Sequence, residues 1–436
     1  MRSLNAAIAI GLAQVVAAED WPQWRGPLGN GVSREKGLPL RWTEASVSWR
    51  ATLGGAGVSS PVVLGDRVFV TSQRGAATQR PGSHPKLARG EGVTAEERPL
   101  ASAGEGPTVF VVEAFQVSDG RRLWERRVPL EGEHAPLHEK HNLASPSPVT
   151  DGEHVFAWFG TGQLVALSAR DGSLSWQRHL GKELGAFEIG WGHASSPALH
   201  GDLLYLLCYH EPASRLLAVD KRSGKTRWTV DRGKDVRSYS TPVVVSGPKG
   251  EELVVNSTDR IDAYDPRSGA HLWHAGSSHN FAVPVPAFHE GVLYASRGYR
   301  SGPYMAIQAG GRGDVNATHV RWEVPTGAPY VSSLLYYDGL LYMASDAGVV
   351  TCVDPSNGQK LWQERTGGIF SASPVAGDGK LYFSSETGEI FVFAPGREPR
   401  LLARNPVGGR IVASPAIAGG TLFLRTDEHL VAIAEK

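Results

Sequence analysis

The sequence predicts an all-β protein, and two recurring features predict its architecture. The first is a glycine four residues before a tryptophan, found at Gly120, Gly172, Gly224, Gly269 and Gly358. The second is a marker in which a small residue precedes a proline, found at Ser60-Pro61, Ser147-Pro148, Ser196-Pro197, Thr241-Pro242, Val285-Pro286, Ser373-Pro374 and Ser414-Pro415, with Ser333-Leu334 in the place of an eighth. Markers usually recur every ~40–50 residues, the length of a four-stranded propeller blade. We therefore expect an eight-bladed β-propeller of four-stranded antiparallel blades.

The glycine motif predicts a strand, a tight turn and a strand. An aspartate precedes the glycine by four residues at Asp220, Asp265 and Asp354. Aspartate folds its side chain onto nearby backbone amides, and glycine supplies the positive φ that closes such a turn. We expect the tryptophan to open the next strand and to offer a large apolar face for packing between blades.

The two ends of the chain together complete the last blade. After Ser414-Pro415 the chain has room for only three strands, and it carries no further glycine motif. The segment Val47-Ser48-Trp49-Arg50 precedes the first marker and is unassigned. We expect this N-terminal strand to complete the eighth blade and to leave no large unpaired edge. A repeat solenoid with polar caps is the alternative.

Residues 1–18 are interpreted as a secretory signal, with an apolar stretch from Leu4 to Val16 and small residues at Ala17 and Ala18. An ordinary N-terminal helix is the alternative. Residues 19–436 then form a single propeller domain, and we expect a mobile insertion at about 73–107, which is rich in Gly, Pro, Arg and Glu. No later segment is apolar for the twenty or so residues of a membrane span. These features predict a periplasmic or secreted protein.

Composition narrows the classes of partner that the protein is expected to bind. Lys plus Arg and Asp plus Glu are equal at 44 each, which disfavours nucleic acid and anionic membranes as partners. The two cysteines, Cys208 and Cys352, are far apart in apolar runs, so we expect buried free thiols and no disulfide framework. We expect a monomer.

With these motifs the repeats resemble the pyrroloquinoline-quinone-like (PQQ-like) β-propeller family, from Trp21 to the C-terminus. That family includes quinoprotein alcohol dehydrogenases and the propeller lipoprotein of the outer-membrane β-barrel assembly machinery. The segments Trp21-Pro-Gln-Trp24-Arg-Gly26-Pro and Ala413-Ser-Pro-Ala-Ile resemble those of secreted bacterial members.

The chain departs from both named members. The dehydrogenases carry a pair of adjacent cysteines beside the quinone, which Cys208 and Cys352 cannot provide, and no calcium ligand set can be assigned. The lipid-bearing cysteine of the assembly lipoprotein is also missing. We expect a non-catalytic binding or scaffolding module that needs no cofactor and holds a protein or a small polar ligand at one propeller face. The alternatives are an oxidoreductase for alcohols or sugars that uses PQQ with calcium, and a polysaccharide hydrolase or lyase.

The residues just before each marker are expected to surround one mouth of the central channel. Four positions before the proline these are Gly57, Ala144, His193, Ser238, Ala282, Tyr330, Phe370 and Ile411. Aromatic planes and hydrogen-bonding groups among and beside them predict a ligand site. The candidate residues are His141, Asn142, Trp191, His193, Arg237, Tyr239, His279, Asn280, Tyr330 and Phe370. The alternative is that they satisfy loop backbone groups and pack between blades. No catalytic residue is predicted.

A histidine cluster lies in the same region. His134, His138 and His141 fall within eight residues, and imidazoles of this kind bind zinc and related metals. Pro136 interrupts the helix that would bring them to one face. A solvated loop with His141 turned toward the channel is our preferred interpretation, and no metal site is predicted.

Overall fold

The computed structural model describes residues 19–75, 106–134, 136–138, 140–299 and 301–435. The expected signal at 1–18 and most of the expected insertion at 73–107 lie outside the described residues. The described helices are short: η1 (Glu44–Ser46), α1 (Leu180–Leu184) and α2 (Asn316–His319). None of the described helices has the length and apolarity to cross a membrane.

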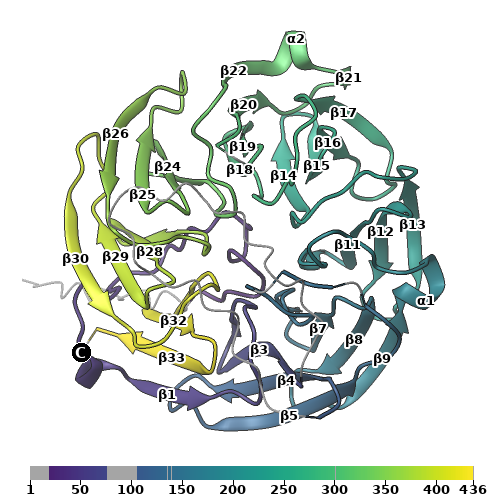
Figure 1. Cartoon of the computed structure of the whole chain (residues 1–436), viewed down its shortest axis with the longest axis vertical. Coiled ribbons are helices and arrows are strands. Elements are labelled where there is room, and N and C mark those ends of the chain that lie inside the picture. The colour runs from purple at the N-terminus through teal and green to yellow at the C-terminus, as the bar shows by residue number, and fades with distance from the viewer. Residues whose placement is uncertain (1–18, 76–105, 135, 139, 300, 436) are drawn as a thin grey trace, which may run out of the picture.

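The described strands form eight sheets arranged around a central axis, as Figure 1 shows. Blade 1 contains β2 (Val62–Leu64), β3 (Arg67–Arg74), β4 (Val109–Gln116) and β5 (Arg122–Pro129). Blade 2 contains β6 (Val149–Thr150), β7 (His154–Trp158), β8 (Gln163–Ser168) and β9 (Leu174–His179). Blade 3 contains β10 (Ala198–His200), β11 (Leu203–Tyr209), β12 (Ser214–Asp220) and β13 (Thr226–Asp231). Blade 4 contains β14 (Val243–Gly247), β15 (Gly250–Asn256), β16 (Ile261–Tyr264) and β17 (His271–Ala275).

The other four blades follow the same plan. Blade 5 contains β18 (Ala287–His289), β19 (Val292–Ser296), β20 (Tyr304–Gln308) and β22 (Val320–Val324). Blade 6 contains β23 (Leu335–Tyr337), β24 (Leu340–Ala344), β25 (Val349–Val353) and β26 (Lys360–Arg365). Blade 7 contains β27 (Val375–Gly377), β28 (Lys380–Ser384), β29 (Glu389–Phe393) and β30 (Leu401–Pro406). Blade 8 contains β31 (Ala416–Ala418), β32 (Thr421–Arg425), β33 (His429–Ala434) and β1 (Trp49–Thr52). The predicted eight-bladed fold is confirmed.

The N-terminal strand closes the ring. Strand β1 pairs antiparallel with β33, in a register that places Trp49 opposite Ala432 and Thr52 opposite His429. The last blade therefore takes three strands from the end of the chain and one from its beginning, as the two incomplete ends of the repeat predict. One addition was not expected: the two-residue strand β21 (Gly313–Asp314), from the blade 5 insertion, pairs parallel to β17 and adds a fifth strand to blade 4.

The glycine and tryptophan motif forms a contact between successive blades. At Gly224, φ is +71°, and a Cβ atom there would lie 2.8 Å from a ring carbon of Trp176 in the preceding blade. The same Trp176 donates its indole N–H to the carbonyl of Lys221 at 2.9 Å. The arrangement recurs in the pairs Gly120 and Trp49, Gly172 and Trp124, Gly269 and Trp228, and Gly358 and Trp322. Only glycine allows this approach and this backbone, so the motif is a constraint on how blades dock.

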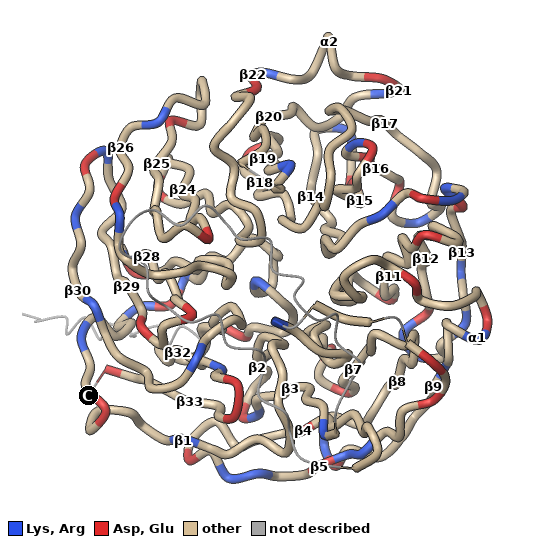
Figure 2. The backbone as a smooth tube through the Cα atoms, in the orientation of Figure 1, with Lys and Arg blue, Asp and Glu red and all other residues tan. Residues whose placement is uncertain are grey.

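Charged side chains lie along the outer strands, and apolar side chains pack between the blades. Figure 2 shows both signs of charge interspersed along the outer strands. The apolar clusters lie between neighbouring blades, and one of them joins Val62 and Phe69 of blade 1 to Val155 and Val165 of blade 2. Cys208 and Cys352 are buried free thiols, as predicted.

Candidate functional site

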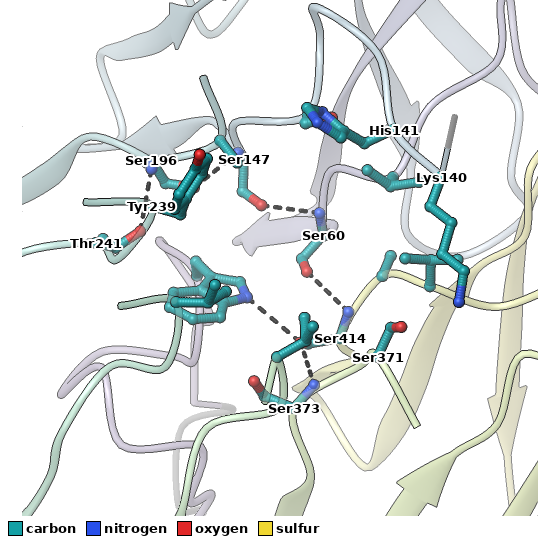
Figure 3. A pocket seen from close by; sticks show the side chains of 18 of the residues that line it. Ser60, Lys140, His141, Ser147, Ser196, Tyr239, Thr241, Ser371, Ser373 and Ser414 are labelled. Atoms are coloured by element: carbon teal, nitrogen blue, oxygen red, sulfur yellow. Dashed lines mark hydrogen bonds between the residues drawn. The ribbon is translucent and has the colours of Figure 1, made fainter. Parts of the chain in front are cut away.

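The hydroxyl residues of the markers form a hydrogen-bonded ring around the channel, which we call the marker ring. In seven of the eight markers the backbone N–H donates to the hydroxyl oxygen of the next marker, and Figure 3 shows part of this series. The bonds run from Ser60 to Ser147 (2.8 Å), Ser147 to Ser196 (2.9 Å), Ser196 to Thr241 (3.0 Å), Val285 to Ser333 (3.0 Å), Ser333 to Ser373 (3.0 Å), Ser373 to Ser414 (2.9 Å) and Ser414 back to Ser60 (3.0 Å). The series is interrupted after Thr241, where the next marker residue, Val285, has no hydroxyl. The marker is thus an inter-blade link as well as a strand signal.

A cavity of about 260 Å³ lies at the centre of the ring, and all eight blades line it. The innermost segments are extended, so their side chains alternate between the cavity and the blade interior. Three positions before the proline, every blade contributes a lining residue: Val58, Ser145, Ala194, Tyr239, Val283, Val331, Ser371 and Val412. One position before it, Ser60, Ser147, Ser196, Thr241, Ser373 and Ser414 line the cavity.

This register corrects the expected ring of mouth residues by one position. Of the residues four positions before the proline, only Tyr330 lines the cavity. Those that lie in the interior are Ala144, His193, Ser238, Ala282, Phe370 and Ile411. A shift of one residue turns an extended chain's side chain to the other face, and this accounts for the difference.

The candidate ligand residues separate into two groups. His141, Trp191, Tyr239 and Tyr330 line the cavity together.

The other candidates lie away from the lining. Asn142 is buried and donates to the carbonyl of Ala56 at 2.9 Å. His193 and Phe370 lie in the blade interior. Arg237 packs over the ring of Phe281, and the backbone of His279 donates to the Thr258 carbonyl at 2.7 Å; neither these two nor Asn280 is among the lining residues. A ligand-binding role for the candidate residues stays a prediction.

Two histidines contact Trp191: His141 at its backbone carbonyl and His138 at its ring. The Nε2 of His141 lies 2.6 Å from the Trp191 carbonyl, and its Nδ1 lies 3.1 Å from the Ser145 hydroxyl. The ring of His138 packs edge-on against Trp191, with centroids 5.5 Å apart. Burial lowers the pKa of His141, more than its two carbonyl contacts raise it, so the imidazole is neutral at pH 7.

An ion pair spans the mouth from blade 2 to blade 7. The Nζ of Lys140 lies 3.2 Å from Oε1 of Glu386, and both side chains are mostly buried. Ser371, a lining residue, donates its hydroxyl to the same carboxylate oxygen. Figure 3 shows Lys140 and Ser371 on one side of the cavity and Tyr239 on the other. The mouth therefore has a charged side and an aromatic side.

The N-terminal segment closes the other end of the channel. Trp21 exchanges two backbone hydrogen bonds of 2.8 Å with Val63, and the carbonyl of Pro22 accepts from Thr150. Both partners lie two positions after their marker proline, so the segment is at the opposite end from the residues that precede the markers. The side chain of Gln23 accepts from Leu199, and the carbonyl of Gly31 accepts from Ala376, which occupy the same position in blades 3 and 7.

Trp24 of this segment reaches the cavity. It is a lining residue, and its indole N–H lies 3.4 Å from the Ser414 hydroxyl. The sequence motif that contains Trp24 resembles a family signature, and nothing local in it indicates a position at the end of the channel. Lys140, Asp346 and Ser371 are further lining residues that the sequence reasoning missed.

Among the described residues, the three side chains whose ligand atoms converge are Asp262, His271 and His274, in blade 4. Asp262 is already bonded by Arg232, Arg260 and His271, which accounts for the cluster as an ion-pair network. The described histidines His134, His138 and His141 do not converge in this way.

The described lining also fits a quinone poorly. PQQ is a tricarboxylate, and Lys140 is the one Lys or Arg among the described lining residues. That cation is already paired with Glu386. A polyanion in this cavity would therefore lack charge compensation, which is costly in a buried site.

Comparisons with known proteins agree with this architecture. The family model described as outer membrane protein assembly factor BamB matches residues 257–365 and 346–436. A curated relative, the outer membrane protein assembly factor BamB of Yersinia pestis, is 22% identical over 257 residues, which is 57% of this chain and 51% of the relative. The chain thus spans about half the length of the curated relative it matches.

Solved structures share the fold at low identity. BamB from Moraxella catarrhalis superposes with a TM-score of 0.57 at 15% identity, covering 89% of this chain and 98% of that one. Quinohemoprotein alcohol dehydrogenase from Comamonas testosteroni superposes with a TM-score of 0.64 at 11% identity, covering 96% and 81%. Identities this low speak to the fold alone, because one fold carries many functions. The chain is an eight-bladed β-propeller whose repeats are similar to the PQQ-like repeats of BamB.

Proposed function

We propose that this protein is an exported, non-catalytic binding or scaffolding module of the cell envelope, and that it holds a protein segment or a small polar ligand at the mouth of its central cavity. The observation that carries the proposal is the cavity itself, which has side chains from all eight blades and is closed at one end by the N-terminal segment. Sites for small ligands are concave and mostly apolar with a few placed polar groups, and this cavity has that character.

The aromatic side of the mouth is the part best suited to a partner. Trp191 and Tyr239 each contact Phe281, with centroids 6.3 Å apart, and Tyr299 connects Phe281 to Tyr330. Phe281 has a φ of +57°, an uncommon backbone for a bulky residue. Backbone strain of this kind is more frequent at functional sites than elsewhere, which supports a binding role for these aromatic residues.

The envelope location and the scaffolding role rest on resemblance. The curated relative is named an assembly factor of the outer membrane, and the N-terminal residues 1–18 read as an export signal. A monomeric, exported propeller with a binding cavity at its centre is consistent with both.

Site-specific photo-crosslinking tests where the partner binds. A photoreactive amino acid replaces Tyr330 at the mouth in one variant and Leu174 on the outer strand β9 in the other, a residue that is 39% exposed. Each variant is irradiated in envelope extract, and its adducts are identified by mass spectrometry. We expect a discrete adduct from Tyr330 and none from Leu174. Equal labelling from both positions, or labelling from Leu174 alone, would contradict the proposal.

The oxidoreductase alternative is tested by reconstitution. Titration with PQQ and calcium, followed by dye-linked assays over alcohols and sugars, should give no change in quinone absorbance, because the cavity lacks free cations for a tricarboxylate. Stoichiometric quinone binding with turnover would replace the proposed function by the catalytic one.

A further inference from the structure

The marker ring leaves hydrogen-bonding capacity unused inside the cavity. Its seven hydroxyls each accept one backbone N–H, and none donates a hydrogen bond to another described residue. A hydroxyl has one hydrogen to donate and two lone pairs, so each retains a donor, and each except Ser414, which also accepts the Trp24 indole N–H, retains one acceptor site. Six of the seven line the cavity. An accepted N–H also polarises the O–H and strengthens it as a donor.

Aromatic side chains line the same cavity as the hydroxyls. Trp191, Tyr239 and Tyr330 line the mouth, and Trp24 lines the closed end. His141 holds the backbone of Trp191 through its carbonyl, and the ring of His138 packs edge-on against the indole, so the indole has a contact that orients it before a ligand arrives. Preformed faces reduce the entropy that binding costs.

The charged groups of the described lining disfavour an anionic ligand. Lys140 and Glu386 neutralise each other, and burial keeps His141 neutral. Asp346 is a further lining carboxylate, which repels an anion and can accept a hydrogen bond from a ligand hydroxyl. A carboxylate ligand could accept from the hydroxyls but would leave their acceptor capacity unused, and an ammonium ligand would leave their donors unused. A ligand whose own groups both donate and accept matches them best.

We propose that the cavity binds a neutral saccharide, with its hydroxyls on the marker ring and a C–H face of its ring against Trp191 or Tyr330. This inference rests on the proposed function, since it names the ligand class of the same cavity. The volume of about 260 Å³ lies just below the range of roughly 300–1,000 Å³ usual for small-molecule sites, which suits one or two sugar rings.

Titration calorimetry and saturation-transfer NMR test the ligand class. The probes are glucose, N-acetylglucosamine, maltose and cellobiose, with citrate, spermidine and benzyl alcohol as anionic, cationic and apolar comparisons. We expect at least one sugar to bind with measurable transfer from the protein, and the three comparison probes to bind at least about tenfold more weakly, a difference of ~1.4 kcal/mol.

Two serine variants separate binding from ring stability. Ser196→Ala and Ser333→Ala each remove one acceptor from the marker ring, with bonds of 2.9 Å and 3.0 Å, and both residues are buried. Only Ser196 lines the cavity. We expect Ser196→Ala to weaken sugar binding about fivefold, the value of one hydrogen bond, and Ser333→Ala to change it less than about twofold. Trp191→Leu should remove measurable binding.

The outcomes distinguish the inference from the function it rests on. Equal effects of the two serine variants, or preferential binding of citrate or spermidine, would overturn the saccharide inference. Failure of every sugar while Tyr330 still crosslinks to a partner would overturn the inference and leave the proposed function standing. Failure of both the sugars and the mouth crosslink would overturn both.

Discussion

Arg425 shows how a single buried side chain can join the last blade to the first. Its guanidinium is 1% exposed and donates to the carbonyls of Ser59 and Thr71 and to the hydroxyl of Ser72. No carboxylate bonds to it among the described residues. Burial lowers the pKa of Arg425 to about 10, so it is still charged at neutral pH. With the Ser59 hydroxyl as a further acceptor, Arg425 therefore satisfies four buried oxygens across the closing junction.

Replacing this residue should weaken the closure. We expect Arg425→Met to lower the free energy of unfolding by about 3 kcal/mol, because several buried acceptors lose their partner. Urea denaturation followed by tryptophan fluorescence measures the loss. The matched control is Arg121→Met, whose side chain is 64% exposed and which should change stability by less than about 0.5 kcal/mol. Similar values for the two variants would contradict this role.

Buried histidines predict acid sensitivity. His193 and His210 are buried beside Phe187, with 3.1 Å between their ring nitrogens. Burial lowers the pKa of His193 from 6.5 to about 3, and burial lowers the pKa of His210 well below its ordinary value. A pKa depressed in the folded state means that the unfolded chain takes up the proton first. Stability is therefore full above pH 6.5 and is lost as the pH falls toward 3.

The magnitude can be measured on one residue. Between pH 7.5 and pH 5, protonation of His193 in the unfolded chain should cost about 2 kcal/mol. We expect His193→Gln to lose that part of the pH dependence in denaturation curves, whatever its stability at pH 7.5. His200→Gln, at a side chain that is 43% exposed, should keep the full dependence. An unchanged slope in the His193 variant would show that its proton does not carry the effect.

At the level of elements, the marker ring lacks one inter-blade hydrogen bond, which a substitution can supply. Val285 occupies the position at which a hydroxyl would accept from the Thr241 amide. Threonine has nearly the shape of valine, so Val285→Thr should complete the ring and raise the free energy of unfolding by about 0.5–1 kcal/mol. Val283→Thr is the control, because it adds a hydroxyl on the cavity side with no amide to accept. If both variants destabilise equally, the ring bonds contribute nothing to docking of the blades.

The contact between glycine and tryptophan gives a second prediction at this scale. Gly224 and Gly201 both have positive φ, of +71° and +58°, but a Cβ at Gly201 meets nothing within 4 Å. Gly201→Ala therefore measures the backbone strain alone, about 1 kcal/mol. Gly224→Ala adds the clash with Trp176 and should cost about 1–3 kcal/mol more. Thermal unfolding compares them, and equal losses would show that the tryptophan ring yields without cost.

Across the whole molecule, the beginning of the chain holds the ring of blades together at two places. Strand β1 completes blade 8, and the segment before it crosses the closed end of the channel, bonding to blades 1, 2, 3 and 7. Figure 1 shows this N-terminal part of the chain crossing the middle of the ring before it reaches β1. The pairing of β1 and the hydrogen bonds of the segment before it hold the same ring of blades, so they position the cavity lining as well as the blades.

The repeat predicted much of this architecture, because its signals are local. The glycine motif predicted the tight turns, because such a turn requires a positive φ. The incomplete last repeat predicted the pairing of Trp49 with the final blade. The site was harder to predict, because its register depends on which face of each innermost strand turns inward. Trp24 acts through contacts with residues as distant as Ser414, which no local pattern contains. His193 and Phe370 were therefore placed at the mouth although both lie inside the blades.

The central claim is that this propeller binds its ligand at the mouth of the cavity, at the end opposite the N-terminal segment. Hydrogen–deuterium exchange of the protein, with and without a saturating concentration of the tightest-binding sugar of the panel, tests it most directly. We predict added protection in the loops that carry Trp191, Tyr239, Tyr330 and Ser371, with the outer strands unchanged. Protection confined to the outer strands or to the closed end, or no change at the mouth, would contradict the account.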